Sequence, residues 1–301
     1  MTAANTHPMD DIPVRPLKFG FKDRSAEDAM WSQSSPLFAI FANAFTLHVP
    51  YFERYLVRTM GKAKRKITDE KLLADVNALI GQEAHHANAF IGFNDLLKRR
   101  YPKAEDLERQ ASQDFAAKMK SDDFKSMIGF TAGYETFTFL AGMMFLGNYD
   151  AWFAESDDAV KALWVWHQVE EVEHAAVAFD VYKYFFAENE WYRKRMVITA
   201  LSHIIKEVTK AYFHMCKIEG YFNSPIKAIK ASWFITKLLS IMLWDVRPVF
   251  SKNYHPRNHP LATTRQNSIA IGWRRFQKSG GDVLAIDKPK MAKIMKLAQI
   301  S

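Results

Sequence analysis

The sequence contains a single cysteine, Cys216, in 301 residues. One thiol excludes an internal disulfide framework and a zinc site built from thiolates, and it is typical of a reducing compartment. The first thirty residues lack the charged, apolar and small-residue blocks of a secretory signal, so we expect a cytoplasmic protein. Zinc-finger, RNP-type and helix-turn-helix signatures are also absent, so we expect no nucleic acid partner.

Apolar runs that are suited to crossing a bilayer are scarce. Residues 130–149 are long enough, but Glu135 lies among them, which favours a buried helix of a soluble bundle. Residues 232–244 are too few and include Lys237, so they belong either to the core or to a membrane surface. The formal charge of +8 is spread over short clusters, which is typical of solvated faces; attraction to an anionic membrane or an acidic partner is the alternative. Peripheral membrane contact therefore stays open.

Alternation of β-branched residues is nearly absent, and beyond residue 33 apolar residues recur at intervals of three and four. This periodicity predicts an all-α protein. We expect helices over 35–61, 69–99, 104–119, 122–147, 157–187, 189–219 and 225–250. Pro50 lies inside the first of these and is expected to kink it.

The composition divides the chain into three parts. Residues 1–33 have no periodic apolar pattern and predict an extended or disordered arm. Residues 34–250 predict a ferritin-like helical domain with extra helices. Residues 251–301 predict an irregular basic tail with a short C-terminal helix.

Four of the expected helices carry acidic residues on the apolar stripe instead of the solvent face. Helical spacing places two Glu-x-x-His pairs on such stripes, and each follows a helix that carries one glutamate. The lone glutamate precedes the paired one by 30 and 36 residues, about one helical hairpin. The six candidate metal ligands are Glu53, Glu83, His86, Glu135, Glu171 and His174.

Four buried carboxylates without partners would cost several kcal/mol each. Two divalent cations would neutralise them, and two imidazoles would complete the coordination. This pattern is typical of the ferritin-like bundles that hold two iron or manganese ions. Oxygen and imidazole donors without thiolate favour iron or manganese over structural zinc, and no organic cofactor is indicated.

Further polar residues surround the second pair. His167 lies one turn before Glu171 on the same line, either as a seventh ligand or as a hydrogen-bond donor beside the ligands. Glu170 either orients a histidine or lies at the helix edge, while Glu173 points away from the site. We treat Glu170 and His167 as candidate catalytic residues. His203 is expected to pack in the core, with a position facing the metals as the alternative.

Four stretches resemble the bacterial proteins described as predicted metal-dependent hydrolases, a ferritin-like group. They are "YFERYLVRTM", "GQEAHHANAF", "GYETFTFLAG" and "WVWHQVEEVEHAAVAFDVY", and the resemblance covers roughly residues 15–280. It implies metal ligands at the six positions above. His167 is similar to the extra histidine of some di-iron N-oxygenases.

Three functions fit this pattern. We expect first a non-haem di-iron or di-manganese oxidoreductase that activates O₂ against a small apolar substrate, because Phe and Met residues accompany the ligands. Such an enzyme would need a reductant protein as partner. The alternatives are a metal-dependent hydrolase that uses a metal-bridging water and a ferritin-type metal-binding protein. A homodimer stays open.

Overall fold

The computed structural model describes residues 7–263 and 267–300. Within these ranges the chain is helical and forms no sheet; the one β-type contact is an isolated bridge between Ser32 and Ser156. The prediction of an all-α protein is confirmed. Residues 1–6, 264–266 and 301, which belong to the expected arm and tail, lie outside the described residues.

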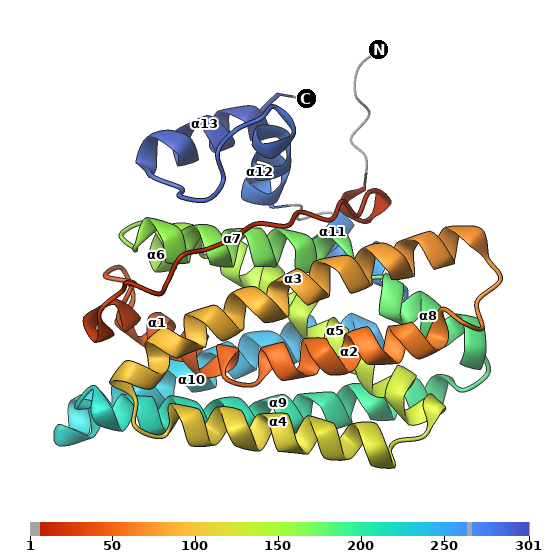
Figure 1. The fold of residues 1–301 in the computed structure, drawn as a ribbon, viewed down its shortest axis with the longest axis horizontal. Helices are drawn as coiled ribbons and strands as arrows, with labels where there is room; N and C mark the ends of the chain where they lie inside the picture. The colour runs from red at the N-terminus through yellow and green to blue at the C-terminus, as the bar shows by residue number, and fades with distance from the viewer. Residues whose placement is uncertain (1–6, 264–266, 301) are drawn as a thin grey trace.

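Four helices form the part of the bundle that carries the predicted ligands, and they run side by side in Figure 1. They are α2 (Val49–Ala63), α3 (Glu70–Arg100), α5 (Phe124–Gly147) and α7 (Asp158–Glu173). Helix α2 packs on α3, α5 packs on α7, and further contacts join α2 to α5 and α3 to α7. Asp69, Asp123 and Asp157 cap three of these helices, because their carboxylates accept hydrogen bonds from backbone N–H groups of the first turn.

The other helices surround these four. They are α1 (Pro36–Thr46), α4 (Ala104–Ser121), α6 (Tyr149–Trp152), α8 (Val177–Phe186), α9 (Glu190–Ile218), α10 (Pro225–Asp245), α11 (Pro260–Thr263), α12 (Ser268–Lys278) and α13 (Lys288–Ala298), with short 3₁₀ turns at Pro8–Asp10, Ala26–Ala29, Tyr221–Asn223, Arg247–Phe250 and Pro256–Asn258. Helices α9 and α10 pack on α1 and α5, while α12 and α13 pair with each other and lie beside α7 (Figure 1). None of the described helices is both long and apolar enough to cross a bilayer.

Two predicted helices are each divided in the structure. The predicted helix 35–61 ends at Thr46 and restarts as α2, with Pro50 in its first turn. Pro50 has no backbone N–H and its ring clashes with the carbonyl four residues earlier. The helix is therefore interrupted instead of kinked. The predicted helix 157–187 is interrupted at His174, which caps α7 with non-helical backbone angles. The cause of this second break is tertiary, because alanines follow His174 and contacts hold both of its ring nitrogens.

The described part of the N-terminal arm crosses α3 and α7 (Figure 1). The carbonyl of Pro13 accepts a hydrogen bond from the Gln82 side chain of α3. Phe19 contacts the ring of Trp166 on α7, at 5.4 Å between centroids, and Phe21 contacts Phe93 of α3 at 5.2 Å. This arm therefore covers the two helices that supply most of the predicted ligands.

Candidate metal centre

All of the predicted ligands lie together in the middle of the bundle. They form two groups, and within each group the ligand atoms lie within 4.8 Å of one another. The first group joins α2, α3 and α7, and the second joins α3, α5 and α7. The first consists of Glu53, His86, His167 and Glu171, and the second of Glu83, Glu135, Glu171 and His174.

Glu171 belongs to both groups and presents a different oxygen to each. Its Oε1 lies 3.0 Å from Nε2 of His167, and its Oε2 lies 3.3 Å from Nε2 of His174. The same nitrogen of His174 lies 3.0 Å from Glu83 Oε1 and 3.3 Å from Glu135 Oε2. A carboxylate in this position is suited to bridge two cations.

Several of these atoms are fully buried and make no hydrogen bond of normal geometry, although Glu83 Oε1 and Glu135 Oε2 lie 3.0 and 3.3 Å from Nε2 of His174. The atoms concerned are one oxygen of Glu53, both oxygens of Glu83, one oxygen of Glu135 and Nδ1 of His86. Buried polar atoms are nearly always paired, because leaving one unpaired costs about 1–3 kcal/mol. Oxygen and nitrogen atoms that converge within a group and lack hydrogen bonds can coordinate a cation. These residues therefore fit a bound metal.

Two histidines are held through the ring nitrogens that face away from the group. Nε2 of His86 lies 2.9 Å from Glu170 Oε2, and Nδ1 of His174 lies 2.9 Å from Gln82 Oε1. Partners of this kind fix the tautomer and the ring orientation of a metal-binding histidine. Glu170 is completely buried, so the expectation that it lies at the helix edge is wrong and its role as a histidine acceptor fits.

Arg15 of the N-terminal arm takes part in the hydrogen-bond networks that hold both histidines. Its guanidinium donates to Glu170 Oε1 at 2.8 Å and to both oxygens of Glu173 at 2.8 and 2.9 Å. Gln82 in turn donates to Glu173 at 3.2 Å. Glu173 does point away from the ligands, as the helical phase predicts, but it is buried against the arm and not exposed to solvent. Sequence patterns gave no signal for Arg15.

Burial and the ring of acids change the pKa values of the ligands. Burial raises the pKa of Glu53 to about 7 and that of Glu135 to about 8. Burial opposes protonation of His86, but the hydrogen bond to Glu170 and the nearby carboxylates of Glu171 and Glu83 outweigh it and raise its pKa to about 10. Burial also acts on Glu171, yet His174 and His167 hold the pKa of that carboxyl well below its usual range. The ligands thus include two carboxyl groups, Glu53 and Glu135, whose raised pKa favours the neutral form, and one, Glu171, that stays ionised.

Aromatic rings enclose the ligand groups. Phe90 lies 4.7 Å from the ring of His167, and Trp166 lies 4.8 Å from the ring of His86, both as edge contacts. His203 lies apart from the ligands and packs between Phe115 and Phe130, as expected.

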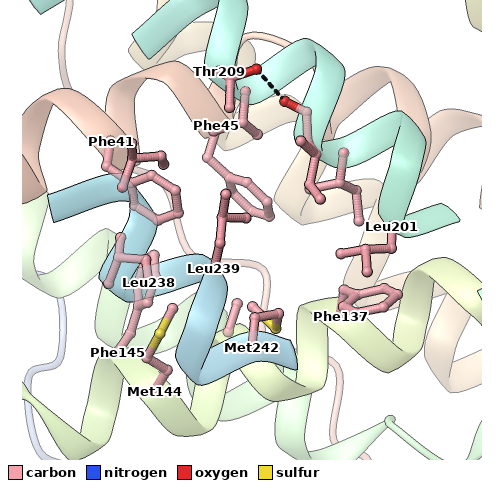
Figure 2. Close-up of a pocket in the computed structure, with 15 residues that line it drawn as sticks. Phe41, Phe45, Phe137, Met144, Phe145, Leu201, Thr209, Leu238, Leu239 and Met242 are labelled. Carbon is pink, nitrogen blue, oxygen red and sulfur yellow. Dashed lines mark hydrogen bonds between the residues drawn. The ribbon is translucent and has the colours of Figure 1, made fainter. Parts of the chain in front are cut away.

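An apolar cavity lies on another side of α5. It lies between α1, α5, α9 and α10, and Figure 2 shows the aromatic and aliphatic side chains that line it. Phe137 and Met144 line this cavity, whereas Glu135 faces the ligand groups from a different face of the same helix. The Phe and Met residues that accompany the ligands in sequence therefore do not all surround the ligands in space.

The fold and these groups define a class: an all-helical bundle with buried carboxylate and histidine clusters able to hold metal ions. Residues 13–260 match the model of the family described as "Predicted metal-dependent hydrolase", and the chain belongs to this family. No curated protein and no solved structure matches the chain.

Proposed function

We propose that the chain is a metal-dependent enzyme whose centre holds two metal ions between α2, α3, α5 and α7. The observation that carries the proposal is the position of Glu171, which offers one oxygen to each ligand group. Glu53, His86 and His167 would complete the first metal site. Glu83, Glu135 and His174 would complete the second.

Iron or manganese suits this donor set. Carboxylate oxygens and imidazole nitrogens are preferred by these ions, whereas softer metals favour thiolates. The thiol of Cys216 is buried on α9, outside both ligand groups. Elemental analysis of the purified chain after loading with Fe(II), Mn(II) or Zn(II) tests this preference.

The chain's own residues would position the ligands and keep the site dry. Glu170 and Gln82 hold the rings of His86 and His174, so their inward nitrogens stay aimed at the centre. The bound metals would supply either Lewis acidity toward a substrate and a water molecule or electrons toward O₂. Because Glu170 contacts Arg15 and His86, we assign it a positioning role in this proposal.

Hydrolysis is the reaction that the family's description supports. Metal ions held by these residues would supply the Lewis acidity that this reaction needs, by lowering the pKa of a water molecule and polarising an ester or phosphate oxygen. The carboxylate of Glu83 lies within the second ligand group, where it would help to hold a cation.

Oxidation by O₂ is the second candidate, and the burial of the centre favours it. Every ligand is at most 2% exposed, and aromatic rings pack against His86 and His167. A site that excludes water protects reactive oxygen species from side reactions. This candidate requires an apolar substrate and an external reductant protein.

One experiment separates the two reactions. The metal-loaded chain is assayed on a panel of nitrophenyl esters and phosphodiesters, and the reduced iron form is mixed with O₂ in an oxygen electrode and a spectrophotometer. Turnover that needs metal and is lost in Glu83→Ala, without O₂ uptake, supports hydrolysis. Uptake of O₂ with a change in visible absorbance supports oxidation. If neither occurs with any of the metals, the proposal of an enzyme is wrong.

A further inference from the structure

Large apolar side chains are exposed on one segment of the molecule. Among the described residues, ten of the fourteen exposed large hydrophobic residues lie between Trp191 and Trp244. Five of them belong to α10: Ile226, Ile229 and Trp233 are each 67% exposed, Trp244 is 63% exposed and Leu243 is 51% exposed. We call these five residues the α10 stripe. An apolar concentration of this kind on a single helix indicates an interaction surface.

The α10 stripe follows helical geometry. Ile226, Ile229 and Trp233 are spaced by three and four residues, and Trp244 falls three turns beyond Trp233, so they share one side of the helix. The opposite side is already occupied. Ile235 and Leu238 are buried there and line the apolar cavity of Figure 2. The stripe is thus the outer face of a helix whose inner face is fixed to the bundle.

The charges along α10 are all positive until its last residue, Asp245. Lys227, Lys230 and Lys237 are exposed, and among residues 7–263 and 267–300 no carboxylate forms an ion pair with them. From Pro225 to Trp244 the helix contains no acidic residue, and Arg247 stacks on the Trp244 ring at 3.2 Å. Exposed tryptophans together with lysines and an arginine on one helix are typical of segments that lie in the headgroup region of a bilayer.

We propose that the α10 stripe docks on the surface of a bilayer that contains anionic lipids. The tryptophan and isoleucine side chains would enter the boundary between headgroups and acyl chains, and the lysines would contact lipid phosphates. The helix is already formed and packed on the bundle, so docking needs no folding step.

A second copy of the chain is a less suitable binding partner for the α10 stripe. A two-fold interface would set Lys230 and Lys237 of one protomer close to the same lysines of its partner. Opposed like charges disfavour such a contact. The lysines and the anionic bilayer, in contrast, are complementary in charge.

Co-sedimentation of the full chain with lipid vesicles tests this proposal. Vesicles of phosphatidylcholine with phosphatidylglycerol should bind the chain at about 50 mM salt and bind it weakly at about 500 mM, because salt screens the lysine contacts. Vesicles of phosphatidylcholine alone should bind it less. The exposed double variant Trp233→Ser/Trp244→Ser should reduce the partition coefficient about tenfold or more, since two aromatic anchors are removed.

The matched control is Leu284→Ser/Ile300→Ser, which changes two exposed apolar residues beside α12 and α13. This control should bind vesicles like the unchanged chain, and circular dichroism should show that all variants are folded. The proposal is overturned if the unchanged chain does not bind anionic vesicles, or if both double variants lose binding equally. It is also overturned if sedimentation shows a dimer that Trp233→Ser/Trp244→Ser dissociates.

Discussion

Arg15 and Glu170 are 155 residues apart in sequence, yet the guanidinium of one donates to the carboxylate of the other at 2.8 Å in the interior of the protein. Through Glu170 this contact reaches His86, and through Glu173 and Gln82 it reaches His174. One arginine of the N-terminal arm therefore supports a histidine of each ligand group. The arm therefore helps to position residues of both groups that could hold a metal ion.

Replacing Arg15 should damage both stability and metal binding. Arg15→Gln leaves Glu170 and Glu173 buried without their counter-charge, which should lower the free energy of unfolding by about 3–5 kcal/mol. Loss of the histidine support should weaken metal binding about 10- to 100-fold. Chemical denaturation and metal titration measure the two effects. Arg24→Gln is the control, because the Arg24–Asp157 pair is about one-quarter exposed and should contribute about 0–1 kcal/mol. Equal effects of both variants would contradict this role of Arg15.

Acid should destabilise the protein through His48. This residue precedes α2 and is buried, and its burial, with His203 nearby, lowers its pKa to about 3. The unfolded chain takes up a proton near the ordinary value of about 6.5, whereas the folded chain does not. The contribution of His48 to the free energy of unfolding is therefore fully present above pH 6.5. It falls as the pH drops toward 3, by up to about 1.4 kcal/mol per pH unit.

Denaturation between pH 7 and pH 4 measures this dependence. His48→Gln should show a flatter fall in stability than the unchanged chain. Identical slopes in His48→Gln and in the unchanged chain would show that His48 is not the group responsible.

A glycine allows a close backbone contact between α5 and α9. A Cβ atom on Gly133 would lie 2.6 Å from the carbonyl oxygen of Met196, and this backbone atom cannot rotate away. Gly133→Ala should therefore lower stability by about 1–3 kcal/mol. Gly92→Ala is the matched control in an exposed helix interior with open space, and it should raise stability by about 1 kcal/mol. Thermal unfolding of both variants checks the two signs, and a stabilised Gly133→Ala would contradict the packing.

Glu171 should differ from the other ligands because it is shared. Glu171→Ala removes one donor from each group and should reduce the occupancy of both metals. Glu53→Ala removes a donor from the first group only and should leave the second metal bound. Metal content after dialysis distinguishes the two results. Equal losses in both variants would contradict two sites joined by one carboxylate.

Much of the centre is predictable from the sequence because it depends on helical spacing. Glu83 and His86 share a line with buried apolar residues such as Leu79, and Glu171 and His174 share a line with the buried His167. Local periodicity of 3.6 residues is enough to place these side chains on one face. The two Glu-x-x-His pairs, each with a glutamate one hairpin earlier, then predict which four helices meet.

The parts that could not be predicted depend on contacts between distant segments. Glu170 looks like an edge residue from helical phase alone, because that reasoning assumes that only the bundle covers the helix. The N-terminal arm covers the side of the helix that faces away from the bundle and supplies Arg15. No periodic pattern in the sequence predicts this contact. The break at His174 has the same origin, because local sequence there favours a continuous helix and contacts with Gln82 and Glu83 override it.

The metal content of the purified, metal-loaded chain tests the central claim most directly. The account predicts close to two iron or manganese ions per chain and a clear loss in Glu83→Ala, whose carboxylate belongs to the second group. Fewer than about one ion per chain, together with no loss in Glu83→Ala, would contradict a dinuclear centre built on these residues.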